Sequence, residues 1–328
     1  MSTTNQPAIV AEGLVKKYGS TVALDGVDLT VPTGTVLGVL GPNGAGKTTA
    51  VRILGTLLRP DAGHAKVGGF DVVKEAGRVR EIIGLTGQYA SVDEDMSGRR
   101  NLVMIGRLIG LSRPQAKSRA DELLERFELT DAGDRIAKTY SGGMRRRLDL
   151  AASLVGNPSI LYLDEPTTGL DPHARNGVWE TVRNLVLDGT TVLLTTQYLE
   201  EADALADSIV VFDKGAVVAN GRPAELKAQA GKQSLDVRPA EPAHLERVAA
   251  IVAESVGTRP SVDVVNALVS VPVTDGSSMP VVVRRLDEAG IAVTELALRL
   301  PSLDEVFLAL TGHAAEEQSA AILEGAGR

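Results

Sequence analysis

The stretch that decides the fold is Gly41-Pro42-Asn43-Gly44-Ala45-Gly46-Lys47-Thr48, which fits the pattern G-x-x-x-x-G-K-[ST] at every specified position. It follows the compact apolar run Thr35–Leu40 and opens a segment of helical character, Gly46–Leu58. Glycines let consecutive backbone N–H groups point at one anion, and a helix N-terminus adds partial positive charge. The stretch therefore predicts a phosphate-binding loop that extends to Thr49, with Lys47 reaching the β- and γ-phosphates and Thr48 the magnesium ion.

An apolar strand that ends in two carboxylates is the second informative segment. Residues Ile160 to Leu163 are followed directly by Asp164 and Glu165. The carboxyl end of a buried strand faces the ligand crevice of an open α/β sheet, so we expect Asp164 to hold Mg²⁺ directly or through water. Successive strand side chains alternate in direction. We therefore expect Glu165 to face an attacking water and to orient or deprotonate it.

The third segment is Tyr140-Ser141-Gly142-Gly143-Met144, followed by three arginines. Ser141 can cap a helix whose first N–H groups remain open to an anion. Taken alone, the segment is a plain helix cap, and Arg145–Arg147 is typical of a solvated helix face. The interpretation changes because all three segments occur in one chain and in this order.

Composition excludes several classes of function. Lys and Arg total 34 against 42 Asp and Glu, a net charge of −8, so the chain as a whole repels nucleic acid and we expect no such partner. With no cysteine and four scattered histidines, disulfides and thiolate metal sites are excluded and a histidine-rich zinc centre is disfavoured. No apolar stretch reaches the length of a membrane span, and the N-terminus lacks a signal-peptide pattern. These features predict an intracellular protein.

The order of the elements predicts two domains. Up to about Gly221, continuous apolar strands alternate with helices, which is typical of a parallel sheet covered on both faces. Beyond Gly231 the order is strand, helix, strand, strand, helix, strand, with one strand expected at Ser261–Val265. We therefore expect an α/β domain at residues 8–231 with a helical subdomain at about 89–156, a small α+β domain at 232–312 and a flexible tail at 313–328.

The last expected helix, about residues 302–312, carries one apolar stripe. Leu303, Val306, Phe307 and Leu310 lie at i, i+3, i+4 and i+7. The simpler interpretation is that the stripe packs on its own small sheet. The alternative is that it docks on the first domain or on a second subunit.

Together the three segments resemble the nucleotide-binding subunits of ATP-binding-cassette (ABC) transporters. The phosphate loop, the Ser141-Gly142-Gly143-Met144 segment and the run from Leu163 to Pro172 carry the resemblance. Within that superfamily the chain is similar to the daunorubicin-resistance-type exporter ATPases, through Thr195–Asp203 and Pro301–Phe307. The resemblance covers about residues 8–312. It implies a P-loop NTPase fold of the cassette type and ATP hydrolysis with Mg²⁺.

The resemblance also implies roles for residues that their local sequence would not single out. Tyr18 would stack on adenine, and Gln88 would touch Mg²⁺ and the attacking water and communicate with a membrane partner. Ser141, Gly142 and Gly143 would bind the γ-phosphate of an ATP held by the opposite subunit, and Asp171 would lie at that dimer interface. In most cassettes a histidine that contacts the γ-phosphate follows the next strand, but here the position is Gln197. Its amide can donate a hydrogen bond but does not titrate near neutral pH.

The function that these features imply is an ATPase subunit of an exporter. It would form a homodimer around two ATP·Mg²⁺ and drive a separately encoded membrane permease for a hydrophobic, antibiotic-like molecule. It would lie in the cytoplasm, bound to the inner face of the membrane through that permease. Two alternatives remain open at this stage: a cassette ATPase that acts on nucleic acid or ribosomes, and a non-hydrolysing regulatory ATP-binding protein.

Overall fold

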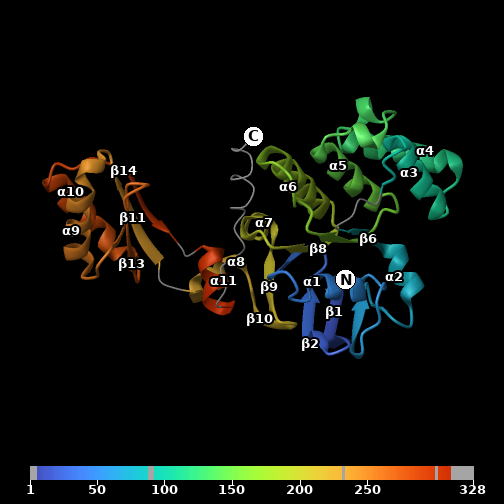
Figure 1. Ribbon diagram of the computed structural model, residues 1–328, viewed down its shortest axis with the longest axis horizontal. Helices are drawn as coiled ribbons and strands as arrows, with labels where there is room; N and C mark the ends of the chain where they lie inside the picture. The colour runs from blue at the N-terminus through green and yellow to red at the C-terminus, as the bar shows by residue number, and fades with distance from the viewer. Residues whose placement is uncertain (1–5, 88–91, 231–232, 300–301, 312–328) are drawn as a thin grey trace, which may run out of the picture. The chain divides into compact units, whose positions relative to one another are not determined.

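The computed structural model describes residues 6–87, 92–230, 233–299 and 302–311. Its chain divides into two compact units, one up to Pro223 and the other from Ala224. Helix α8 (Pro223–Ala230), which we expected in the first domain, groups with the second unit. Each unit has its own sheets and its own core (Figure 1).

A six-stranded sheet, of strand order β10-β9-β3-β8-β7-β6, forms the centre of the first unit. All neighbours pair in parallel except β9 and β10, which form an antiparallel hairpin. Its strands are β3 (Val36–Leu40), β6 (Ile83–Thr86), β7 (Ile160–Asp164), β8 (Thr191–Thr196), β9 (Ser208–Asp213) and β10 (Ala216–Gly221).

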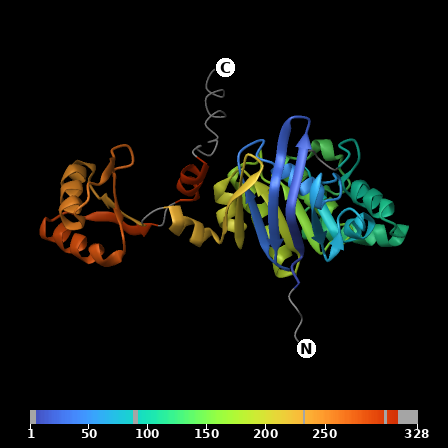
Figure 2. The same cartoon turned by 90° about the horizontal axis from the view of Figure 1, so that it is seen from below.

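A second, antiparallel sheet of order β2-β1-β4-β5 lies in the same unit (Figure 2). Its strands are β1 (Ile9–Tyr18), β2 (Thr21–Val31), β4 (Ala62–Val67) and β5 (Phe70–Asp71). The two long strands, β1 and β2, carry exposed polar residues along part of their length.

Helices cover both faces of the parallel sheet, as its continuous apolar strands predicted. Strand β7 shows the division: Leu161 and Leu163 pack among the helices of one face, whereas Ile160 and Tyr162 face α1 and the antiparallel sheet. The helices are α1 (Lys47–Leu54), α2 (Ala76–Ile82), α3 (Gly98–Leu108), α4 (Arg113–Arg126), α5 (Gly142–Ser153), α6 (Pro172–Leu187) and α7 (Leu199–Leu205).

The second unit contains a four-stranded antiparallel sheet of order β12-β13-β11-β14. Helices α9 and α10 lie on one side of it (Figure 1) and bury Leu235, Val237, Val269 and Val271 beneath them. The elements are β11 (Gln233–Pro239), α9 (Leu245–Val256), β12 (Ser261–Asp263), β13 (Leu268–Val273), α10 (Met279–Glu288), β14 (Val293–Arg299) and α11 (Leu303–Thr311).

The apolar stripe of α11 is buried, but not in the core of this sheet. Leu303, Val306 and Phe307 are at most 5% exposed, and none of them belongs to the hydrophobic cluster between the sheet and α9 and α10. The simpler interpretation, in which the stripe packs on the small sheet, is therefore wrong for these three side chains. Figures 1 and 2 both place α8 beside α11. The side chain of Leu310 and residues 313–328 lie outside the described part of the chain.

Candidate functional site: a phosphate loop facing two carboxylates

The loop between β3 and α1 has the backbone that phosphate binding requires. Gly46 has a positive φ of 106°, and a Cβ atom there would lie 2.4 Å from the carbonyl oxygen of Ala23. No other residue fits this position, because both the conformation and the space demand glycine. The loop therefore delivers the chain directly into α1, whose first N–H groups face the loop and favour an anion.

Lys47, the first residue of α1, lies along this loop. Its ammonium donates hydrogen bonds to the carbonyl oxygens of Gly41, at 2.6 Å, and Pro42, at 3.1 Å, and only 5% of the residue is exposed. Because the stem is buried, the charged end stays next to the loop amides. The cation is thus already held where the loop would gather phosphate oxygens.

The structure brings Thr48 and Asp164 together from positions 116 residues apart. The Thr48 hydroxyl lies 3.3 Å from Oδ2 of Asp164, and the hydroxyl of Thr195, in the neighbouring strand β8, donates to Oδ1. Asp164 is only 4% exposed. A buried carboxylate beside a hydroxyl supplies the oxygen donors that Mg²⁺ prefers, so these residues fit the predicted magnesium site.

Glu165 follows Asp164 but points elsewhere. Its φ is +50°, a left-handed conformation that non-glycine residues adopt rarely, and its N–H donates to the carbonyl oxygen of Thr195 at 3.0 Å. The Thr168 hydroxyl donates to its carboxylate at 3.3 Å. The strained turn at the end of β7 thus places the Glu165 carboxylate beside Thr168, whereas the Asp164 carboxylate contacts Thr48 and Thr195.

Ser141, Gly142, Gly143 and Asp171 line a second cleft, of about 720 Å³. Ser141 caps α5 by accepting the N–H of Met144 at 3.2 Å, and Asp171 caps α6 by accepting that of Ala174 at 2.9 Å. These backbone hydrogen bonds lower the pKa of Asp171. No described residue of the phosphate loop lines this cleft. Within one chain, the serine–glycine segment and the phosphate loop therefore form separate surfaces.

Arg146 is a functional candidate that the sequence did not reveal. Its guanidinium donates to the carbonyl oxygens of Pro166, at 2.6 Å, and Glu165, at 3.1 Å. Burial lowers its pKa, and the nearby carboxylates of Asp149, Glu201 and Asp164 oppose that shift. The expectation of a solvated basic face is wrong here, because Arg146 holds the loop that carries Glu165. Arg145 and Arg147 form ion pairs with Glu94 and Glu128.

A buried carboxylate near Gln197 is a second residue that the sequence did not reveal. Glu201 is fully buried, and its Oε1 accepts the indole N–H of Trp179 in α6 at 3.1 Å. Burial raises its pKa. The Oε1 atom of Gln197, just beyond β8, is buried and makes no hydrogen bond with the described residues. Helix α7 therefore carries a polar cluster beside the end of β8.

The remaining expected site residues are Tyr18, which the structure describes, and Gln88, which it does not. Tyr18, at the end of β1, is 48% exposed and can offer a free ring face, with the Lys16 ammonium 5.9 Å from the ring centre. Gln88 lies outside the described residues. In the described part of the chain, no three His, Asp or Glu side chains form a metal cluster. Nor does any helix there combine the length and the apolar surface needed to cross a bilayer.

Comparison with known proteins extends the assignment over both units. The ABC transporter family matches residues 24–168, and the C-terminal domain of DrrA1-3-like ATP-binding proteins matches residues 221–311. The daunorubicin resistance ATP-binding protein DrrA2 of Streptomyces coeruleorubidus is 55% identical over 95% of this chain and 98% of its own length. The daunorubicin/doxorubicin resistance ATP-binding protein DrrA of Streptomyces peucetius is 51% identical over 97% of each chain.

Among solved structures, cbiO1 from Clostridium perfringens, part of the cbiONQ ABC transporter complex, matches 68% of this chain and 92% of its own. The TM-score is 0.64 at 26% identity. A nucleotide-free ATP-binding cassette from an ABC transporter matches with a TM-score of 0.61, also at 26% identity, over 66% of this chain and 92% of its own.

The fold and the site define an ATP-binding cassette, the ATPase component of ABC transporters. More narrowly, the chain belongs to the ABC transporter ATP-binding proteins of the DrrA daunorubicin/doxorubicin resistance type. The family and the fold class that the sequence motifs predicted are confirmed.

Proposed function

We propose that this chain hydrolyses ATP·Mg²⁺ as a head-to-tail dimer and thereby drives a separate membrane permease that exports a hydrophobic drug. The single observation that carries the dimer is the separation of the two nucleotide-binding surfaces within one chain. The phosphate loop would cover one side of a triphosphate, whereas Ser141 and Asp171 line a different cleft. A second copy, turned head to tail, would place its serine–glycine segment against the γ-phosphate.

The chemistry at this site would rest on positioning and electrostatics. The loop amides and Lys47 would hold the phosphates, and Thr48 and Asp164 would hold Mg²⁺, with Gln88 as a further ligand. When bound, the ion would neutralise charge on the phosphate oxygens. Glu165, directed away from Asp164 by its left-handed backbone, would orient the attacking water and accept its proton.

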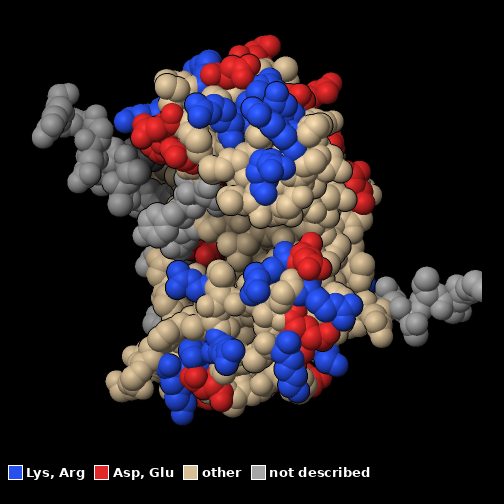
Figure 3. Space-filling model, turned by 90° about the vertical axis from the view of Figure 1, so that its right-hand side faces the viewer, with Lys and Arg blue, Asp and Glu red and all other residues tan. Residues whose placement is uncertain are grey.

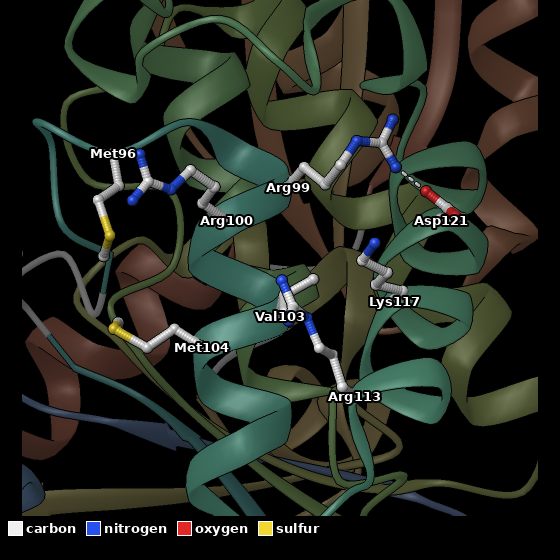
Figure 4. Close-up of a pocket in the computed structure, with 8 residues that line it drawn as sticks. All are labelled: Met96, Arg99, Arg100, Val103, Met104, Arg113, Lys117 and Asp121. Atoms are coloured by element: carbon white, nitrogen blue, oxygen red, sulfur yellow. Dashed lines mark ion pairs between the residues drawn. The ribbon is translucent and has the colours of Figure 1, made fainter.

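A cleft in the helical subdomain supports the proposed permease contact. It has a volume of about 590 Å³ and lies between α3 and α4 (Figure 4). Arg99 pairs there with Asp121, whereas Arg100, Arg113 and Lys117 make no ion pair with the described residues. Val103 lies among these cations (Figure 4), and Met104 also lines the cleft.

The chemistry of the cleft fits a short permease segment with an apolar side chain and carboxylates. The apolar side chain would contact Val103 and Met104, and the carboxylates would pair with the free cations. Figure 3 views this end of the cassette and shows Lys and Arg side chains gathered over it among fewer Asp and Glu. Through this contact the chain would lie at the inner face of the cell membrane.

The contact is tested with the double variant Arg113→Glu, Lys117→Glu. We expect it to lose co-purification with the permease encoded in the adjacent reading frame, while ATP hydrolysis by the isolated chain stays within about twofold of wild type. Arg247→Glu, an exposed charge reversal on α9, is the control. Wild-type retention of the permease by the double variant would contradict this docking site.

Drug export rests on the relatives, two of which are named for daunorubicin resistance. It is tested in cells that express the chain with its permease, by the loss of daunorubicin fluorescence from preloaded cells. Lys47→Ala should abolish ATP-dependent efflux, because it removes the cation at the β- and γ-phosphates. Efflux at the wild-type rate with Lys47→Ala, or no efflux with the wild-type pair, would contradict the proposal.

A further inference from the structure

Strand β14 leaves one long edge of the C-terminal sheet without a strand partner. Among the residues that the structure describes, it pairs with β11 on one side only, and it is seven residues long. The strand at the opposite edge, β12, has only three residues and so offers little backbone for pairing. It ends in a turn in which Asp263 accepts the N–H of Asn266 at 3.1 Å. A long edge strand displays unpaired backbone groups that can template another strand. The β14 edge can therefore pair with a further strand.

The two faces of β14 carry different side chains. Leu296 packs against the hydrophobic cluster under α9 and α10, and Leu298 shares its face because strand side chains alternate. Glu295, Ala297 and Arg299 lie on the opposite, open face. Glu295 pairs there with Arg238 at 3.1 Å and with Arg299, and Arg299 also pairs with Asp236 at 3.1 Å.

This pattern is complementary to itself. In an antiparallel pair, residues directly opposite each other lie on the same face, so a two-fold register must match positions of equal parity. A two-fold axis at Ala297 places Glu295 opposite Arg299 of a second copy and Leu296 opposite its Leu298. At the axis itself two alanines meet, which leaves room for the backbones. A register centred on residue 296 would instead place the charged Arg299 opposite Val293.

We propose that β14 pairs antiparallel with β14 of a second copy of this chain, centred on Ala297, and so holds two subunits together without nucleotide. The two four-stranded sheets then form one continuous eight-stranded sheet with α9 and α10 of both copies on the same face. On the open face of the joined sheet, opposite charges face each other across the axis. On the face beneath α9 and α10, leucines face each other. The interface is isologous, which closes the assembly at two copies.

This association goes beyond the nucleotide-bound dimer. It uses the β14 edge instead of the nucleotide-binding surfaces, and it forms without nucleotide. A short strand ladder alone gives weak association, since its buried area is small. When ATP also bridges the cassettes, however, the two contacts reinforce each other through effective concentration. After hydrolysis the β14 contact keeps the subunits paired, so each new round starts from a dimer rather than from monomers.

The test uses opposite charge reversals in the full-length chain, without nucleotide and with EDTA. In Glu295→Arg, two arginines face each other at each pair; in Arg299→Glu, two glutamates do. Sedimentation velocity should show a dimer for wild type and at least a tenfold weaker dimer for each variant. An equimolar mixture should restore the dimer, because both cross-strand pairs are then of opposite charge.

Controls separate this interface from misfolding and from cassette closure. Both variants should keep wild-type affinity for ATP, which shows that the cassette is folded, and recovery of the dimer in the mixture shows that the second unit is folded as well. Glu254→Arg, which breaks the ion pair with Arg285 between α9 and α10, should leave the dimer intact. The proposal is overturned if nucleotide-free wild type is monomeric at tens of micromolar, if either single variant dimerises like wild type, or if the mixture stays monomeric.

Discussion

The guanidinium of Arg146 donates its Nε–H to the carbonyl oxygen of Pro166 at 2.6 Å, and so ties α5 to the loop that carries Glu165. The same side chain reaches the carbonyl oxygen of Glu165. Helix α5 begins at the Ser141 cap, so one helix carries both the γ-phosphate candidate and the residue that fixes the proposed base. Movement at Ser141 can therefore reach Glu165 through a single rigid element.

Replacing Arg146 tests this connection. Arg146→Ala removes charge-assisted hydrogen bonds to the loop, each worth about 1.5–3 kcal/mol, and leaves partly buried carbonyls without these donors. We expect hydrolysis to fall at least about tenfold, or ~1.4 kcal/mol, while ATP binding changes little. The control is Arg126→Ala, which removes an exposed ion pair with Asp188 at 2.5 Å. If Arg146→Ala hydrolyses ATP as fast as this control, Arg146 does not position the base.

Gln197 stands where most cassettes have histidine, and its role is open to a direct test. Its amide can donate to a phosphate oxygen while its own Oε1 stays buried. We expect Gln197→Ala to lower kcat by roughly tenfold, about 1.4 kcal/mol. Gln197→His should retain activity, and its rate of hydrolysis should change at a pH of about 6.5, which the wild-type rate should not. Full activity of the alanine variant would exclude a catalytic part for this position.

The raised pKa of Glu201 predicts a pH-dependent stability. Because burial raises the pKa in the folded state above 4.5, the folded chain binds the proton more tightly, and stability falls as pH rises from 4.5 through the folded pKa. Glu201→Gln removes the charge and keeps an acceptor for Trp179. The variant should therefore melt above wild type at pH 8, by a difference that shrinks toward pH 4.5. Fluorescence of Trp179, the chain's single tryptophan, reports the same titration. Equal melting temperatures at pH 8 would contradict a charged Glu201 in this pocket.

The predicted nucleotide-bound dimer must be separated from the β14 contact. We combine Glu165→Gln, which should bind ATP without turning it over, with Arg299→Glu, which should weaken the β14 pairing. Without nucleotide this double variant should sediment as a monomer, and with ATP and Mg²⁺ as a dimer. Adding Ser141→Arg, which fills the cleft at α5, should abolish the ATP effect. An ATP-induced dimer that tolerates Ser141→Arg would count against the role of Ser141 in the opposite site.

The sequence predicted the parts of the site that depend on short-range pattern. The phosphate loop, the strand ending at Asp164 and the cap at Ser141 all form as expected, because glycine placement, apolar runs and capping residues act locally. The helix after the loop ends at Leu54 rather than Leu58, since Gly55 and the positive φ of Thr56 interrupt it. The expected strand Ser261–Val265 likewise ends at Asp263, because Asp263 turns the chain.

Other features depend on partners distant in sequence. Arg146 looked like part of a solvated basic run, since the carbonyls that it binds come from a loop twenty residues away. Glu201 is one of several acidic residues in α7, and only the fold places Trp179 against it. The sequence did contain one signal for Arg146. It lies at the start of a capped helix, and a buried strand that ends in carboxylates follows soon after, so hydrogen-bond acceptors are close to it.

The central claim is that Glu165 performs hydrolysis at a nucleotide held by Lys47 and the phosphate loop. The most direct measurement is single-turnover release of phosphate from ATP and Mg²⁺ by wild type and Glu165→Gln, alongside equilibrium binding of ATP. The account predicts a loss of at least about a hundredfold in rate, ~2.7 kcal/mol, with ATP affinity within a few-fold of wild type. Phosphate release by Glu165→Gln at the wild-type rate would contradict it.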